Sequence, residues 1–378
     1  MHKKKAIVFS SVFYHSKIKV GSHHYAEALS KEGYDVLYIS FPVSILHLFF
    51  FFKNDNLVRL INRFKSHKKD NLNSFIPFSI LPLLNVFPFN SLFLLNKWVW
   101  FSDMHFNKQV NNFIKNVDLI WVESAYFIDT VKYLKKNNTQ IKIYTRLSDN
   151  VFAFNNFPKN YCHLLNESFS LSDKIIVSAK SLTKLIDEKF ANKVFHLPNG
   201  INNNQLKSYS IEMPSEYLID KNETKIIYIG ALENWFDWEI ILHLLNKVPN
   251  ISIYIIGPVN GKNIKIKHDN LFLLGTRSHN QIGKYLKNAD IGIIPFKRND
   301  LIDYVDPIKF YEYSFFDIPT VCTYWEEVSL FTETIYLAKD KMEFSDHIKF
   351  LINMKSSNDT FNVDLTNRDW HQNLKKLI

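Results

Sequence analysis

The sequence has 378 residues, too many for one ordinary hydrophobic core, so two domains are expected. Hydrophobic residues make up 46% of the chain, which is enough for extensive burial and excludes an intrinsically disordered protein. The net charge of +9 is uneven: residues 1–165 hold 21 Lys and Arg against 10 Asp and Glu, whereas the remainder holds 25 against 27. This asymmetry predicts an anionic partner for the first half, either a membrane or a nucleic acid.

The chain opens with Met-His-Lys-Lys-Lys and runs directly into an apolar strand over 6–10, without the long apolar segment of a secretory signal. We therefore expect a cytoplasmic protein. A helix from Ser22 to Glu32 and a strand over 35–40 complete a β-α-β unit. The loop over 10–21 lacks Gly-x-Gly-x-x-Gly, and the nine glycines of the chain form no Walker-type loop. The sequence therefore disfavours nicotinamide dehydrogenases and P-loop NTPases.

Three histidines, His15, His23 and His24, lie near this loop. Adjacent histidines on a helix point about 100° apart, so they do not share one face as metal ligands would. We predict no metal site, and we expect one of these histidines to contact a polar substrate.

Residues 42–101 depart from the strand–helix rhythm. Apolar residues at 57, 60, 61 and 64 alternate with basic ones, which predicts a basic amphipathic helix. Residues 71–96 carry no charge, but their three prolines exclude a continuous spanning helix. We expect this region to dip into an anionic leaflet, the alternative being an insertion packed on the first domain. Nucleic acid is disfavoured because its binding needs no such uncharged stretch. The expected membrane contacts are Arg59, Arg63, Lys68, Lys69, Trp98 and Trp100.

A strand over 141–146 runs into Asp149. The carboxyl ends of parallel strands line the crevice where ligands bind, so Asp149 stands where a general base would be placed. Asp is also a frequent cap of helices and turns. Position alone leaves base and cap open.

The second half repeats strands and helices from 174 to 295, including a helix expected over 181–190, and predicts a second open parallel sheet. A helix then begins near Pro307. Lys309 and Glu312 are three residues apart on one side of it. A lysine aimed at a diphosphate and a glutamate aimed at ribose hydroxyls would form a sugar-nucleotide pocket at the helix start. The alternative is an exposed Lys–Glu pair.

Several motifs of the second half together resemble the donor-binding half of GT-B glycosyltransferases. They are Leu-Pro-Asn-Gly-Ile-Asn (197–202), Tyr-Ile-Gly-Ala-Leu-Glu (228–233), Ile-Gly-Pro (256–258), Ala-Asp-Ile-Gly-Ile-Ile-Pro-Phe (289–296), Pro-Ile-Lys-Phe-Tyr-Glu-Tyr (307–313) and Ile-Pro-Thr-Val (318–321). The first half is similar, more loosely, to membrane-associated transferases of the xanthan glucuronosyltransferase kind. The resemblance implies an α/β protein of the GT-B fold, with two Rossmann-like parallel-sheet domains facing a cleft. The expected domains are 1–168 for the acceptor and membrane, 169–355 for the donor, and a C-terminal helix within 356–378 that packs back on the first domain.

The resemblance also assigns roles to single residues. Lys309 would contact the donor diphosphate, and Glu312 would contact the ribose hydroxyls. Asp149 would match the catalytic base. The backbone near Arg277 would meet the nucleobase of the donor. The remaining expected site residues are Gly230 beside the phosphates, Glu233 and Phe296 in the donor site, and His23 and His24 on the acceptor side. Two positions depart from the family pattern, because Asp317 stands where Gly or Ala is usual and Asn150 stands where a second carboxylate often follows.

These observations predict a glycosyltransferase, acting in polysaccharide or glycolipid assembly on the inner face of the cell membrane as a peripheral protein. Its partners would be a nucleotide sugar, expected to be a UDP-sugar, a lipid-linked saccharide acceptor and an anionic membrane surface, with no nucleic acid. No Asp-x-Asp occurs, so the reaction is expected to need no metal and no cofactor beyond the co-substrate. It would be inverting if Asp149 is the base and retaining otherwise. A nucleotide-sugar epimerase of the same fold and a non-catalytic membrane scaffold remain as alternatives.

Overall fold

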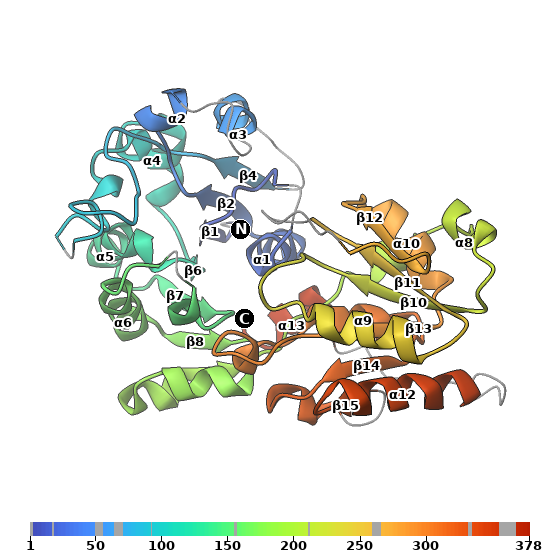
Figure 1. Ribbon diagram of the computed structural model, residues 1–378. Coiled ribbons are helices and arrows are strands. Elements are labelled where there is room, and N and C mark those ends of the chain that lie inside the picture. Colours follow the sequence, from blue (N-terminus) through green and yellow to red (C-terminus); the bar gives the residue numbers. More distant parts are fainter. Residues whose placement is uncertain are drawn as a thin grey trace. The chain divides into compact units, whose positions relative to one another are not determined.

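The computed structural model describes residues 3–16, 19–49, 56–63, 71–91, 93–154, 157–210, 212–258, 266–331, 335–354 and 368–378. The chain folds into two compact units, one formed by 1–198 together with 370–378 and the other by 199–369 (Figure 1). Each unit is built around a parallel β-sheet of its own.

The described residues of the first unit form a seven-stranded parallel sheet. In sheet order its strands are β4 (Leu72–Phe75), β2 (Asp35–Ser40), β1 (Lys5–Ser10), β6 (Leu119–Val122), β7 (Lys142–Leu147), β8 (Lys174–Val177) and β9 (Val194–His196). The strands are apolar along most of their length because helices cover the sheet; the residues from Ala6 to Phe9 are fully buried. The chain order reverses between β1 and β6, which makes this pair the switch point of the sheet.

Helices of the first unit surround this sheet (Figure 1). They are α1 (Gly21–Lys31), α2 (Ile45–Phe49), α3 (Asn56–Arg63), α4 (Lys108–Ile114), α5 (Ile128–Asn137), α6 (Tyr161–Leu171) and α13 (Trp370–Lys375). A short parallel pair, β3 (Val43–Ser44) and β5 (Phe78–Ser79), precedes the 3-10 turns η1 (Lys97–Val99) and η2 (Asp103–His105). Among the described residues, no helix has both the length and the apolar character needed to cross a bilayer.

The second unit has a parallel sheet of six strands within the described ranges. Their order is β12 (Leu271–Gly275), β11 (Ile251–Ile256), β10 (Thr224–Ile229), β13 (Ile291–Ile294), β14 (Thr320–Thr323) and β15 (Ile335–Ala338). The switch point here lies between β10 and β13, which pair through Ile226 and Ile291. The helices are α7 (Asn203–Lys207), α8 (Ser215–Ile219), α9 (Trp238–Lys247), α10 (His279–Lys287), α11 (Ile308–Phe315) and α12 (Lys341–Met354).

The division between the units falls later than the boundary expected at residue 168. The strands β8 and β9 extend the first sheet, because β8 pairs with β7 from Tyr144 to Leu147. Helix α13 also belongs to the first unit, where Trp370 stacks on His24 with ring centroids 4.9 Å apart. The part of the expected C-terminal helix over 356–367 lies outside the described residues.

Candidate functional site

The neighbouring strands β10 and β11 of the second sheet bring two glycines together at their carboxyl ends. Gly230 follows β10 with φ +155°, and Gly257 follows β11 with φ +156°, conformations that favour glycine. The Gly230 N–H donates to the Ile256 carbonyl over 2.8 Å. A Cβ at Gly257 would lie 1.9 Å from the Gly230 carbonyl oxygen. The two glycines therefore let the backbone at these strand ends come close together.

Lys309 reaches this strand edge from the first turn of α11. Its Nζ lies 5.4 Å from the centroid of the Phe296 ring, beyond β13, and 5.6 Å from that of Tyr228, in β10. A Cβ at Gly230 would lie 2.7 Å from the same Nζ. Burial lowers the pKa of Lys309, and the Glu312 charge opposes that shift. The predicted residues Gly230, Phe296 and Lys309 thus meet at one place, around a half-buried ammonium group.

Glu312 lies one helical turn beyond Lys309 and is also half-buried. Burial raises its pKa to about 6, although the nearby Lys309 charge lowers it. In the described part of the chain, neither Lys309 nor Glu312 has a hydrogen bond or an ion pair. Two desolvated, unpaired charges destabilise a fold, and such groups are typical of binding and catalytic sites.

The other expected donor residues are Glu233 and Arg277. Glu233 is half-buried after Gly230, and its carbonyl accepts the Phe236 N–H over 3.1 Å. Arg277 follows β12, two strands from β10, which is about 10 Å by strand spacing. Its guanidinium forms an ion pair with Glu216 over 3.8 Å.

The unusual Asp317 has a conformational explanation. Its φ is +55°, the left-handed position that ends α11 and that glycine most often occupies. Asp is one of the few other residues that tolerate this conformation. Its departure from the family pattern leaves the turn after α11 intact.

In the first unit, Asp149 follows β7 at the carboxyl edge of the sheet. Its Oδ2 accepts the Ser148 hydroxyl over 3.0 Å. Burial raises the pKa of Asp149 to about 6, offset in part by Ser148 and Arg146 and reinforced by Glu123. The capping role considered for Asp149 belongs instead to Asn150, whose side chain accepts the Phe152 N–H over 3.1 Å.

A buried ion pair lies beside Asp149. Arg146 of β7 and Glu123, just after β6, are 3.1 Å apart, and both side chains are nearly inaccessible. A Cβ at Gly21, the first residue of α1, would lie 2.5 Å from the Arg146 Nη1. This pair fixes the start of α1 against the carboxyl ends of β6 and β7.

His23, expected on the acceptor side, is a structural residue. It is fully buried; its Nδ1 accepts the Val20 N–H over 3.2 Å, and its Nε2 lies 3.1 Å from the Phe13 carbonyl. Burial lowers its pKa to about 4, so the ring is neutral. Both nitrogens are committed to the loop before α1, which corrects the prediction for His23. His24 stacks on Trp370.

The arginines of α3 do not face outward, which corrects their predicted contact with lipid head groups. Arg59 donates to the carbonyls of Phe41 and Pro42 over 2.9 and 3.1 Å. Arg63 donates to the Ile76 carbonyl over 2.8 Å and pairs with Asp103. Lys68 and Lys69 lie outside the described residues.

The two tryptophans expected at a membrane behave differently. Trp98 is 1% exposed and packs edge-on against Phe127, so its predicted membrane contact is wrong. Trp100 is 45% exposed, and its indole N–H donates to Asp129 over 3.0 Å. The same carboxylate accepts Asn96 over 2.6 Å and Lys97 over 2.7 Å. Asp129, on α5, therefore anchors the segment that carries Trp100.

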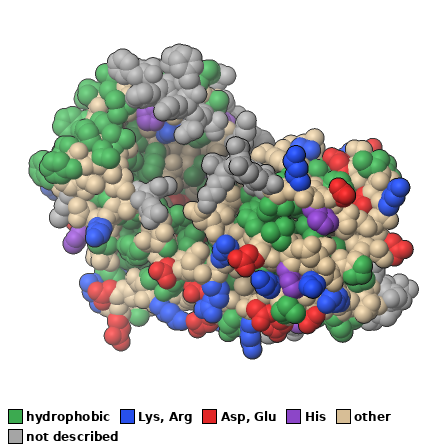
Figure 2. Space-filling view, in the orientation of Figure 1, with side chains coloured by type: hydrophobic (Ala, Val, Ile, Leu, Met, Phe, Trp, Pro, Cys, Tyr) green, Lys and Arg blue, Asp and Glu red, His purple; other side chains and the backbone are tan. Residues whose placement is uncertain are grey.

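Large hydrophobic side chains are exposed on α3 and along residues 80–106. We call the first set the α3 face (Leu57, Val58 and Ile61) and the second the 80–106 surface (Ile80, Val86, Phe87, Phe93, Phe101 and Phe106). Figure 2 shows hydrophobic side chains gathered at the left edge of the first unit. Both charged residues of segment 80–106 are paired, Lys97 with Asp129 and Asp103 with Arg63. The described residues of this segment therefore present no unpaired Lys, Arg, Asp or Glu.

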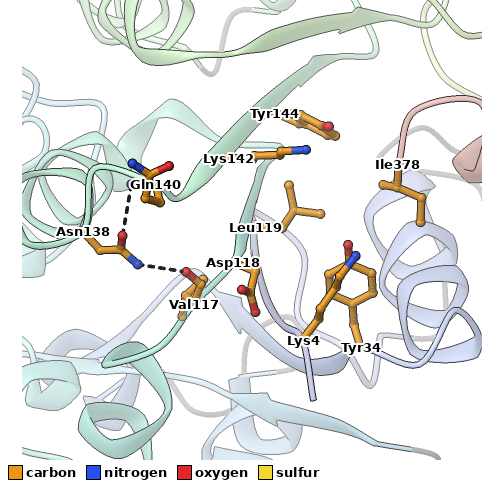
Figure 3. A pocket seen from close by; sticks show the side chains of 10 residues that line it. All are labelled: Lys4, Tyr34, Val117, Asp118, Leu119, Asn138, Gln140, Lys142, Tyr144 and Ile378. Carbon is orange, nitrogen blue, oxygen red and sulfur yellow. Dashed lines mark hydrogen bonds between the residues drawn. The ribbon is translucent and has the colours of Figure 1, made fainter. Parts of the chain in front are cut away.

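A cavity of about 240 Å³ lies at the edge of the first sheet formed by the amino ends of its strands (Figure 3). Its lining includes Leu119, the first residue of β6, and Lys142, the first residue of β7. Ligands of open parallel sheets bind at the carboxyl ends of strands, and this cavity is at the amino ends. It is separate from Asp149, at the far end of β7.

Sequence reasoning missed two contributors. Tyr228 lies beneath Lys309, and Arg146 lies beside Asp149. The sequence held a signal for each. Tyr228 is one residue from the end of an apolar strand, and Arg146 is a charged residue inside another apolar strand. Polar atoms at the carboxyl end of a buried strand need partners, which points to a site there.

Two parallel sheets, each with its strand order reversed beside its first strand, give the chain the GT-B fold. Solved structures of that class superpose on nearly all of it. Sucrose-phosphate synthase of Thermosynechococcus elongatus gives a TM-score of 0.67 at 11% identity, covering 99% of this chain and 92% of the synthase. HepE of Anabaena, in complex with UDP and glucose, gives 0.67 at 15% identity, covering 100% and 98%. The expected GT-B fold is confirmed.

A family model matches a continuous part of the first unit. The family model of the glucuronosyltransferase GumK, N-terminal domain, matches residues 8–178, so this part of the chain is similar to that domain. The UDP-glucuronate:glycolipid 2-beta-glucuronosyltransferase of Xanthomonas campestris pv. campestris is 24% identical over 232 residues, 59% of this chain and 53% of that protein. The putative teichuronic acid biosynthesis glycosyltransferase TuaH of Bacillus subtilis (strain 168) is 25% identical over 161 residues, 40% of each. The matched regions thus span about half the length of these relatives.

Proposed function

We propose that this protein is a glycosyltransferase that moves a sugar from a UDP-sugar to a lipid-linked saccharide acceptor. The observation that carries the proposal is the unpaired, half-buried Lys309 at the β10/β13 switch point, with Glu312 one turn away. The related proteins agree with it. The Xanthomonas relative is named for a UDP-glucuronate donor and a glycolipid acceptor, and the HepE structure holds UDP and glucose.

In this proposal Lys309 binds the donor diphosphate. The ammonium group would neutralise the negative charge that accumulates on the diphosphate as the sugar leaves, and its low-polarity surroundings would strengthen that interaction. The backbone at Gly230 would approach the phosphates without a side chain in the way. The Glu312 carboxylate would accept hydrogen bonds from the ribose hydroxyls.

Asp149 would act as general base. A sugar hydroxyl is a weak nucleophile, so a carboxylate must take its proton as the hydroxyl attacks the anomeric carbon and the nucleoside diphosphate departs. A pKa of about 6 suits this task, because the carboxylate is ionised at neutral pH and yet a better proton acceptor than an ordinary Asp. The reaction would then invert the anomeric configuration. Retention is the alternative if Asp149 is dispensable.

We also propose that the protein binds the inner face of the cell membrane through the α3 face and the 80–106 surface. All six side chains of the 80–106 surface are more than half exposed along this one segment. Monomeric proteins rarely leave such apolar area in water, and a lipid-linked acceptor has to be met at a bilayer. Because Arg59 and Arg63 bind the protein itself, insertion of apolar side chains would supply most of the affinity.

Calorimetric titration with UDP tests the donor site. Wild type should bind, and Lys309→Ala and Glu312→Ala should each weaken binding. Lys284→Ala is the matched control, because Lys284 is a lysine of the same unit whose exposed ammonium pairs with Glu212. A wild type that binds no UDP, or binding equal in all variants, would favour the non-catalytic scaffold.

A thermal-shift screen of nucleotide sugars then identifies the donor, because a ligand that binds only the folded state raises the midpoint of unfolding. Turnover with that donor and a lipid-linked saccharide separates transfer from epimerisation. An epimerase would convert the nucleotide sugar without an acceptor and would not need to float with liposomes.

A further inference from the structure

A buried carboxylate lies where the chain enters the second unit. Asp306, 4% exposed, directly precedes Pro307, the N-cap of α11. Its Oδ2 accepts the backbone N–H of Asn199 over 2.6 Å, and its backbone carbonyl accepts the Asn199 side-chain amide over 2.8 Å. Asn199 is the first residue of the unit, so Asp306 accepts two hydrogen bonds from the segment that enters it.

The last residues of the second unit, Arg368 and Asp369, lie beside its first residues. The Ile201 N–H donates to the Arg368 carbonyl over 2.9 Å, and Ile201 forms a parallel bridge with Asp369, the last residue of the unit. The Arg368 guanidinium lies 5.2 Å from the centroid of the Tyr311 ring. The Tyr311 hydroxyl donates to Asp306 Oδ1 over 2.6 Å. Entering and leaving segments therefore converge on Asp306 and Tyr311.

Both of these residues are connected to the Lys309 site through α11. Asp306 precedes the helix, and Tyr311 lies within it, between Lys309 and Glu312. A short α-helix moves as a rigid rod, so a displacement at its first turn carries both charged side chains with it. Among the described residues, no hydrogen bond or ion pair joins the Asp306 side chain to Lys309 or Glu312, so its effect on them is indirect.

We propose that Asp306 is a positioning residue that fixes the first turn of α11, and with it Lys309 and Glu312, to the two segments joining the units. This inference rests on the proposed nucleotide-diphosphate site. A carboxylate suits the position because it only accepts hydrogen bonds, and it faces two donors, the Asn199 N–H and the Tyr311 hydroxyl. Alanine would leave both donors buried without an acceptor.

The test compares UDP affinity with thermal stability in the full chain. Asp306→Ala should weaken UDP binding by about 10- to 100-fold, the cost of displacing a binding group by a fraction of an ångström to an ångström. Asp306→Asn should stay within about threefold of wild type, because its Oδ1 can accept Asn199 and its amide can donate to the Tyr311 oxygen. Tyr311→Phe, which deletes one hydroxyl, should fall between them.

Asp129→Ala is the matched control. Asp129 is a carboxylate of the first unit that is 8% exposed and accepts three hydrogen bonds, so its loss should lower the melting temperature and leave UDP affinity unchanged. A folded Asp306→Ala with wild-type affinity overturns the inference. If that variant does not fold, wild-type affinity in Tyr311→Phe overturns it.

The outcomes also separate this inference from the proposed function. Absence of UDP binding in wild type, or unaltered binding in Lys309→Ala, would contradict the donor site itself. Weaker binding in Lys309→Ala with unaltered binding in Asp306→Ala and Tyr311→Phe would contradict the positioning role alone.

Discussion

A Cβ at Gly230 would lie 2.3 Å from the Cε of Lys309. Real Cβ atoms do not approach so closely, so the lysine occupies space that only glycine leaves open. We expect Gly230→Ala to push Lys309 aside and, with φ at +155°, to strain the backbone. UDP affinity should fall by about 10- to 100-fold in calorimetry.

The control for this variant is Gly33→Ala. Gly33 also has a positive φ, +88°, but no atom lies within 4 Å of the position of its Cβ. It should lose about 1 kcal/mol of stability from backbone strain and retain wild-type affinity for UDP. Equal affinity in wild type and Gly230→Ala would show that Lys309 does not meet the ligand at this glycine.

The affinity for a UDP-sugar should depend on pH through Glu312. Burial raises the pKa of Glu312 to about 6, so lowering the pH through 6 protonates the carboxylate that accepts the ribose hydroxyls. A charge-assisted hydrogen bond exceeds a neutral one by about 1 kcal/mol, so affinity should fall about fivefold toward pH 5. In Glu312→Gln the affinity should be lower at neutral pH and flat across this range. A diphosphate diester is the right probe because it has no ionisation near pH 6.

Turnover should depend on Asp149. Asp149→Asn should lower kcat by about 10²- to 10⁴-fold with UDP binding unchanged. In wild type, kcat/KM should rise with pH through about 6, where the carboxylate becomes able to accept a proton. Retained turnover in the variant would reject the base and favour a retaining reaction.

We expect Asp149→Asn to raise the stability of the fold at neutral and higher pH, although it lowers turnover. Because burial raises the pKa of Asp149 in the fold, its contribution to stability is present at low pH and is lost as pH rises through about 6. Asp149→Asn should therefore be more stable than wild type at pH 8, by about 1 to 3 kcal/mol in urea unfolding. Near pH 4 the difference should vanish.

Membrane binding should resist salt. Leu57→Asp combined with Ile61→Asp places two charges on the α3 face and should reduce flotation with both neutral and anionic vesicles, at low and high ionic strength. Lys68→Ala with Lys69→Ala tests the electrostatic contribution, which salt screens. Loss of binding only in the lysine variant, or only at high salt in wild type, would contradict insertion.

The sequence was enough to predict both sheets, because parallel strands buried on two faces are continuous apolar runs. The spacing of Lys309 and Glu312 and the glycine turns are local features, and the donor site that they indicate stays a prediction. Helix 181–190 was wrong: the chain forms two 3-10 turns, η5 (Lys180–Leu185) and η6 (Glu188–Lys193). The Asp187 side chain accepts the Lys189 N–H and starts a second turn, which interrupts the helix.

The outward direction of side chains in α3 could not be predicted from periodicity alone. The pattern marks an apolar and a basic face, and the expectation placed the basic residues on the lipid head groups of a membrane. Arg59 and Arg63 instead bind the carbonyls of Phe41, Pro42 and Ile76, which strands and turns distant in sequence leave available. Tertiary hydrogen bonds to the backbone determine the orientation, and no local signal announces them.

The first unit is discontinuous, and this sets an order on its assembly. Helix α13 packs on α1, the Asn373 amide donates to the Pro198 carbonyl over 3.0 Å, and the Tyr144 hydroxyl donates to the Leu377 carbonyl over 3.2 Å. During synthesis α13, with Asn373, and Leu377 after it are made only after all of residues 199–369. The second unit is one uninterrupted stretch and can fold without later residues, whereas the first unit lacks the packing of α13 on α1 until residues 370–375 have been made. A nascent chain of this design would finish its second lobe before its first.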